Sequence, residues 1–168
     1  MKISVKKLAV AAMMTALGVV LSTFYIPVGV SKCFPIQHLL NVLAGVFLGP
    51  WYALGFAFCT SLIRNLMGTG SLLAFPGSMV GAFLCGLIYR KFEKIPFAVL
   101  GEVIGTGIIG GMLCYPVAHF LLGNTQAALF TSVLPFLIST VGGSLIAAIF
   151  LAALYKSKAF FYMADRLR

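Results

Sequence analysis

The chain has 168 residues and a formal net charge of +9; 61% of its residues are hydrophobic and only 9% are charged. Soluble domains carry about 25% charged residues, so this composition excludes an ordinary soluble protein and indicates an integral membrane protein. We therefore expect an all-α, multi-pass membrane protein built as a single transmembrane domain over residues 1–168, with almost no room for a soluble domain.

The basic residues are concentrated in three short segments of the chain. Only Lys32 and Arg64 lie outside them; the clusters are Lys2, Lys6 and Lys7, then Arg90, Lys91 and Lys94, then Lys156, Lys158, Arg166 and Arg168. Such clusters are typical of loops that stay in the cytoplasm under the positive-inside rule. The charge therefore indicates membrane orientation, and we expect no binding to nucleic acid.

Apolar segments bounded by charged or turn residues predict a compact bundle of six transmembrane helices. The first segment is too long for the apolar region of a signal peptide. Gly49-Pro50 divides a long uncharged stretch in two, because proline removes a backbone donor and restricts the residue before it. We expect spans at 8–30, 35–48, 51–66, 71–89, 96–122 and 126–155, a basic and aromatic tail at 156–168, and both termini in the cytoplasm.

Two familiar motifs do not carry their usual meaning in this chain. Gly105, Gly107 and Gly110 spell the dinucleotide fingerprint, but they lie in an apolar span with no preceding strand, so we expect them to pack helices closely. The four cysteines are scattered without metal-ligand spacing, so neither zinc nor a disulfide is expected. A phosphate-binding loop is also absent. We expect no cofactor in this chain, and any ATP must be bound by another subunit.

Most of the uncharged polar residues fall on the outer side of the predicted topology. They follow the first span, flank the turn between the third and fourth spans, and close the fifth span: Gln37, His38, Asn41, Asn65, Thr69, Ser71, Ser78, Tyr115, His119, Asn124 and Gln126. Polar groups in a span usually face a cavity or one another. We expect an outward-facing pocket, with Lys32 reaching the lipid headgroups and Glu102 serving as a packing residue.

Three stretches of the chain resemble a known family. They are residues 27–41 (PVGVSKCFPIQHLLN), 48–53 (LGPWYA) and above all 64–79 (RNLMGTGSLLAFPGSM). The chain resembles a substrate-binding S-component of an energy-coupling factor vitamin transporter, specifically the ThiW family. The resemblance covers most of the chain, and the third stretch is its most specific part.

The resemblance implies a binding subunit in the plasma membrane of a prokaryote and no enzymatic activity. Its substrate would be hydroxyethylthiazole, a thiamin precursor. Its partners would be a transmembrane coupling subunit and two ATPases, which drive the subunit to topple and release its ligand inside. The family's first helix contacts the coupling subunit through an AxxxA pattern, which Ala12 and Ala16 match.

A small heteroaromatic alcohol needs aromatic walls and a few hydrogen-bonding partners. The predicted substrate-binding residues that supply them are Phe34, Gln37, His38, Asn41, Arg64, Asn65, Thr69, Ser71, Phe75, Ser78, Tyr115 and His119. Two cations beside a neutral ligand suit a phosphorylated or carboxylated ligand better, so an anionic precursor or another small vitamin is the alternative. An autonomous secondary transporter is a further alternative, although such a protein would usually show inverted repeats and the sequence shows no convincing repeat. An enzyme would pair His119 with an acidic partner, which the outer side of the predicted topology does not offer.

Overall fold

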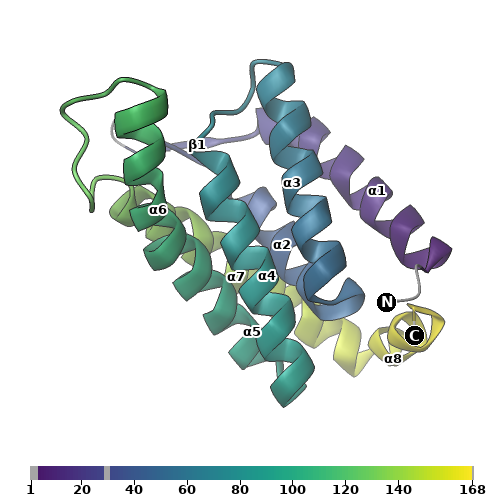
Figure 1. The fold of residues 1–168 in the computed structure, drawn as a ribbon. Coiled ribbons are helices and arrows are strands. Elements are labelled where there is room, and N and C mark those ends of the chain that lie inside the picture. Colours follow the sequence, from purple (N-terminus) through teal and green to yellow (C-terminus); the bar gives the residue numbers. More distant parts are fainter. Residues whose placement is uncertain (1–3, 29–30, 168) are drawn as a thin grey trace.

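The computed structural model describes residues 4–28 and 31–167. Residues 29, 30 and 168, which fall in the expected first span and tail, lie outside the described residues. The long helices run side by side as a bundle (Figure 1). The elements are α1 (Val5–Val20), η1 (Leu21–Thr23), β1 (Ile26–Val28), β2 (Ser31–Cys33), α2 (Pro35–Leu48), α3 (Pro50–Leu66), α4 (Ala74–Phe92), α5 (Ile95–Glu102), η2 (Val103–Gly110), α6 (Gly111–Pro116), η3 (Val117–Leu121), α7 (Val133–Lys156) and α8 (Ala159–Leu167).

The expected first span, 8–30, is not one helix. It ends as a 3₁₀ turn at Thr23, and the chain continues into an antiparallel hairpin in which Ile26 pairs with Cys33 and Pro27 with Lys32. Pro27 disfavours helical backbone at the residue before it. The preceding Phe24, Tyr25 and Ile26 are of types that favour extended structure. The fold is therefore mostly helical, with one short hairpin at the end of the bundle.

The break expected at Gly49-Pro50 is present. α2 ends at Leu48, Gly49 has a φ of 85°, and α3 starts at Pro50. Glycine adopts this left-handed backbone without steric cost, and proline is well suited to the first helical position. α2 is buried on most of its surface and packs against both α4 and α7, so it lies in the interior of the bundle.

The segments α5, η2, α6 and η3 form one continuous helical rod from Ile95 to Leu121. Its two η segments are π-helical, and the second follows Pro116, which cannot donate a backbone hydrogen bond. The chain then forms irregular turns instead of starting the sixth helix near Gln126. Asn124 and Thr131 side chains accept backbone N–H groups there, so α7 begins only at Val133.

Glycines let α4 and η2 touch along their length. A Cβ on Gly105 would lie 2.7 Å from Gly81 Cα, and one on Gly110 would lie 2.6 Å from Gly77 Cα. A Cβ on Gly107 would lie 2.5 Å from the Leu137 side chain. The GxGxxG glycines therefore pack helices, as expected from their apolar setting.

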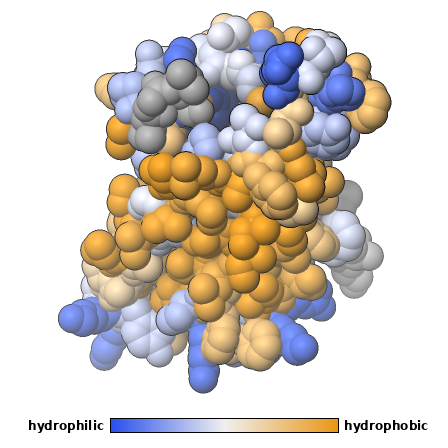
Figure 2. Space-filling view, turned by 90° about the vertical axis from the view of Figure 1, so that its left-hand side faces the viewer, coloured by the Kyte–Doolittle hydropathy of each residue, from blue (hydrophilic) through white to orange (hydrophobic). Residues whose placement is uncertain are grey.

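Three helical segments are long and apolar enough to cross a membrane: Val5–Thr23, Ile95–Leu121 and Val133–Lys156. On the face shown in Figure 2, apolar residues form a broad band across the middle of the molecule, and hydrophilic residues gather above and below it. The two ends of the chain lie at the same end of the bundle, and the β1–β2 hairpin lies at the other (Figure 1).

Candidate ligand-binding site

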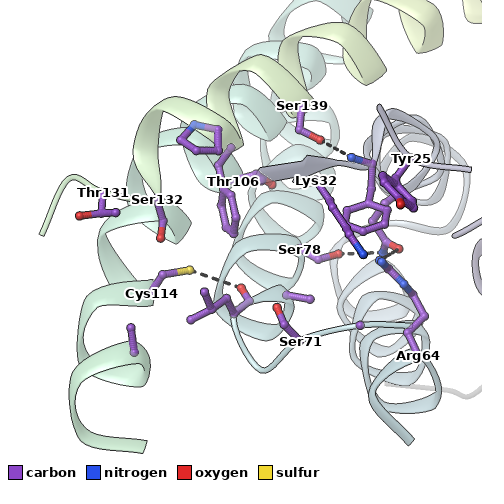
Figure 3. Close-up of a pocket in the computed structure, with 18 of the residues that line it drawn as sticks. Tyr25, Lys32, Arg64, Ser71, Ser78, Thr106, Cys114, Thr131, Ser132 and Ser139 are labelled. Carbon is purple, nitrogen blue, oxygen red and sulfur yellow. Dashed lines mark hydrogen bonds between the residues drawn. The ribbon is translucent and has the colours of Figure 1, made fainter. Parts of the chain in front are cut away.

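A pocket of about 820 Å³ lies at the hairpin end of the bundle (Figure 3). Its walls come from the hairpin, from α2, α3, α4, η2, α6 and α7, and from the loops at 67–73 and 122–132. A volume of several hundred Å³ with a few polar groups on a mainly apolar lining is usual for small-molecule sites. The pocket can therefore hold a small organic ligand.

One wall of the pocket combines two cations with two aromatic rings. Lys32 Nζ lies 4.6 Å from the centre of the Tyr25 ring, and the Arg64 guanidinium carbon lies 4.2 Å from the centre of the Phe34 ring. The two rings are themselves 6.1 Å apart. Both distances from cation to ring are within the range of cation–π attraction. This cationic wall therefore consists of Tyr25, Lys32, Phe34 and Arg64.

Arg64 is held at the end of α3 by the turn that follows it. The backbone N–H groups of Thr69 and Gly70 both donate to the Arg64 carbonyl, at 2.9 and 3.0 Å. Gly68 supplies the positive φ of 72° that this turn needs. The guanidinium donates to Gln37 Oε1 at 3.1 Å and to the Thr69 carbonyl at 3.4 Å, and the residue is only 2% exposed. The turn therefore sets the position of a buried cation.

A chain of hydrogen bonds runs from Arg64 into the interior of the bundle. Gln37 donates to Ser78 Oγ at 3.0 Å, and Ser78 donates to Asn41 Oδ1 at 3.2 Å. Asn41 donates in turn to Glu102 Oε1 at 2.9 Å. These hydrogen bonds connect α3, α2, α4 and α5, so they link the wall of the pocket to the core of the bundle.

Glu102 is the inner end of this chain and is fully buried. Besides the Asn41 amide, its Oε1 accepts a hydrogen bond from Thr106 Oγ1 at 2.9 Å and lies 3.0 Å from His38 Nδ1. Its Oε2 has no hydrogen-bond partner among the described residues. Glu102 packs inside the bundle as expected, and it also fixes the side chains of three other buried polar residues.

The wall opposite the cations carries hydroxyl and thiol groups. The Cys114 thiol on this wall donates to the Leu73 carbonyl at 3.3 Å. Ser139 instead borders the cationic wall, because its Oγ accepts the Phe34 backbone N–H at 2.8 Å. Thr131 and Ser132 lie on the same side of the pocket as Cys114 (Figure 3). This hydroxyl wall offers short donors and acceptors to a ligand that spans the pocket.

Eight of the twelve predicted substrate-binding residues line the pocket: Phe34, Gln37, His38, Arg64, Thr69, Ser71, Ser78 and Tyr115. The other four do not. Asn41 is fully buried below it, and the Asn65 amide donates to the Ser61 and Ser71 carbonyls. Phe75 packs on the Phe58 ring, and His119 stacks on Tyr115. These four side chains support the pocket from outside its lining.

Several lining residues were not predicted, including Tyr25, Thr106, Ser132 and Ser139, and Lys32 was expected at the headgroups. A signal for some of them was present. Thr106 follows Glu102 by four residues and so shares its helix face. Ser132 and Ser139 are seven residues apart, which also places them on one face of a helix. Tyr25 and Lys32 meet only through the hairpin, which helical periodicity does not reveal.

Among residues 4–28 and 31–167, no group of three or more His, Cys, Asp or Glu side chains is placed to hold a metal ion. The combination of long apolar helices and a pocket with polar groups at one end is that of a membrane protein that binds a small molecule. Residues 8–157 match the family model described as "Thiamine-precursor transporter protein (ThiW)", so the chain belongs to this family. None of the curated proteins matches the chain. Membership of a transporter family is consistent with the expectation that the protein is not an enzyme.

Proposed function

We propose that this protein is the substrate-binding S-component of an energy-coupling factor importer and that it captures hydroxyethylthiazole, the thiazole precursor of thiamin. The observation that carries the proposal is the pocket of about 820 Å³, lined by aromatic and hydrogen-bonding groups, in a member of the thiamine-precursor transporter family. The chain acts as a single transmembrane domain in the plasma membrane of a prokaryote.

The pocket faces outward in this proposal, and six helical rods cross the membrane. The supporting observation is the distribution of charge. Among the described basic residues, only Lys32 and Arg64 lie at the pocket end, whereas those at the opposite end are Lys6, Lys7, Arg90, Lys91, Lys94, Lys156, Lys158 and Arg166. The positive-inside rule then assigns the second end, with both termini, to the cytoplasm.

The lining suits a small heteroaromatic alcohol. The rings of Phe34 and Tyr115 offer faces for the thiazole to stack on, and the Ser139 hydroxyl, which accepts the Phe34 N–H, still has its proton to donate to the ring nitrogen or the alcohol. Aromatic contacts of this kind contribute about 0.5–1.5 kcal/mol beyond the apolar area that they bury. Binding therefore combines a stacked ring with a few directed hydrogen bonds.

Calorimetry on the purified protein tests the substrate. Hydroxyethylthiazole is expected to bind saturably at one site per chain, whereas thiamin and its pyrimidine precursor bind weakly or not at all. Phe34→Ala should lower the affinity at least about tenfold, because it removes an aromatic wall. Phe161→Ala, at an exposed ring on α8, is the matched control and should leave it unchanged. Absence of heat with the thiazole alcohol would remove the substrate assignment.

The proposed partners are a transmembrane coupling subunit and two ATPases, which use ATP to drive toppling and release of the ligand inside. α1 offers the surface for the first of these. Ala12 and Ala16 are exposed one turn apart on α1, and Met13 and Leu17 beside them are also exposed, at 66% and 51%. Small residues four apart allow a partner helix to approach closely.

Substitution of these alanines separates binding from transport. Ala12→Leu and Ala16→Leu are expected to abolish uptake in cells that express all subunits, while the purified variants still bind the thiazole in calorimetry. Ala152→Leu introduces the same bulk at an exposed position on α7 and should affect neither. Uptake by the chain alone, without coupling subunit and ATPases, would instead identify an autonomous secondary transporter.

A further inference from the structure

We propose that the cationic wall is an anion subsite and that the pocket binds the phosphate monoester of the thiazole alcohol more tightly than the free alcohol. This inference rests on the proposed function, because it assumes that the pocket is the substrate site. In this proposal, the phosphate is the charged group that the ligand presents to Lys32 and Arg64.

Arg64 is a buried cation with no anionic partner. Its two hydrogen bonds go to neutral acceptors, Gln37 Oε1 and the Thr69 carbonyl. Its Nε is buried and has no hydrogen-bond partner among the described residues. A guanidinium stays charged in proteins, and a buried charge without a counterion is strongly unfavourable. The side chain therefore requires an acceptor that the described part of the protein does not supply.

The chain has no acidic residue to neutralise this wall. It contains only three, and two of them, Glu93 and Asp165, lie at the cytoplasmic end, on the C-cap of α4 and on α8. The third, Glu102, directs Oε1 to His38, Asn41 and Thr106. Among the described residues, His38 Nδ1 and Glu102 Oε1 form the one contact between a basic nitrogen and a carboxylate oxygen at salt-bridge distance, 3.0 Å. The pocket thus carries two formal positive charges and, within the described lining, no negative one.

The aromatic rings orient the two cations for an anion between them. Phe34 covers the face of the guanidinium, which leaves the in-plane N–H edge for an acceptor. Planar guanidinium groups bind carboxylate and phosphate oxygens through that edge in a two-pronged geometry. Lys32, which is exposed and extends into the pocket from β2 (Figure 3), adds a mobile second charge.

The size of the pocket is consistent with a ligand longer than the free alcohol. The cavity of about 820 Å³ extends from the cationic wall to the hydroxyl wall formed by Thr131 and Ser132. A thiazole ring beside the hydroxyl wall directs its hydroxyethyl arm towards Lys32 and Arg64. A phosphate on that arm carries a charge of about −1.5 to −2 at neutral pH and three acceptor oxygens. The free alcohol supplies no such charge.

The decisive experiment compares three ligands by calorimetry on the full chain in neutral detergent: the thiazole alcohol, its phosphate monoester and inorganic phosphate. The monoester is expected to bind at least about tenfold more tightly than the alcohol, with an advantage that shrinks as salt is raised. Alcohol binding equal to or tighter than that of the monoester overturns the inference and leaves the proposed function intact. Absence of binding by both overturns the proposed function as well.

The inorganic phosphate arm identifies the source of the anion. Weak binding of inorganic phosphate, with the monoester preferred at least tenfold, supports a site for the phosphorylated precursor. Equal binding of inorganic phosphate and monoester overturns that assignment, because the wall would then hold any phosphate, including that of a lipid headgroup.

Variants at Lys32 test the wall itself without disturbing the core, because this side chain is exposed. Lys32→Gln is expected to lower the ratio of monoester to alcohol affinity about tenfold, and Lys32→Arg should restore it. Lys94→Gln removes the same charge at the cytoplasmic end and serves as the control. An unchanged ratio in Lys32→Gln contradicts the proposal.

Discussion

Replacement of Glu102 by alanine is expected to lower the stability of the protein more than any other single removal of a charge. The substitution leaves the His38 ring, the Asn41 amide and the Thr106 hydroxyl without their common acceptor. An unsatisfied buried polar group costs about 1–3 kcal/mol, and this substitution removes an acceptor shared by three buried side chains. We expect a loss of about 3–5 kcal/mol, visible as a melting midpoint lower by on the order of 10 °C in detergent.

Two comparison variants distinguish the loss of the buried hydrogen bonds of Glu102 from a general effect of removing a charge. Glu93→Gln removes a negative charge at the exposed C-cap of α4 and should leave the melting midpoint within about 2 °C of the parent. Glu102→Gln retains a carbonyl acceptor, so its melting midpoint should lie between those of Glu102→Ala and Glu93→Gln. A Glu102→Ala protein that melts like the Glu93→Gln control would show that the three donors find other partners. Loss of Glu102 should also weaken ligand binding, since His38 and Thr106 line the pocket.

The helices were predictable where composition and charge agree. The break between α2 and α3 follows from two adjacent residues, Gly49 and Pro50, whose backbone limits are independent of the rest of the fold. Polar residues in an apolar chain also indicated where the pocket would lie, because such residues need one another or water. Local chemistry was sufficient for both conclusions.

Other features depend on contacts between distant segments, which no local pattern contains. The hydrogen bonds of Glu102 come partly from α2, more than sixty positions away, so the carboxyl looked like an isolated packing residue. Phe75 belongs to the predicted polar turn region, yet α4 directs its ring to Phe58 on α3. The apolar run that predicted the first span continues to residue 30, although Pro27 and the aromatic residues before it favour a hairpin. That hairpin brings Lys32 to the pocket.

The contact between α2 and α7 depends on one glycine. A Cβ on Gly143 would collide with the Pro35 carbonyl oxygen and lie 2.8 Å from His38 Cβ. Backbone atoms cannot move aside as a flexible side chain does, so Gly143→Ala must push α2 away from α7. Overpacking of this kind costs about 1–3 kcal/mol and occasionally more. The displaced segment carries Gln37 and His38, so the pocket and the polar chain shift with it.

The neighbouring residue provides a matched control. Gly142 directly precedes Gly143 in α7, but a Cβ on Gly142 would meet no atom within 4 Å. Gly142→Ala is expected to leave both melting midpoint and ligand affinity close to those of the parent. Gly143→Ala should lower the midpoint by several degrees and the affinity by at least about tenfold, since helix displacements of even 1 Å misplace binding groups. Equal behaviour of the two alanine variants would mean that α2 and α7 can separate without cost, and would contradict the close packing that holds His38 against Glu102.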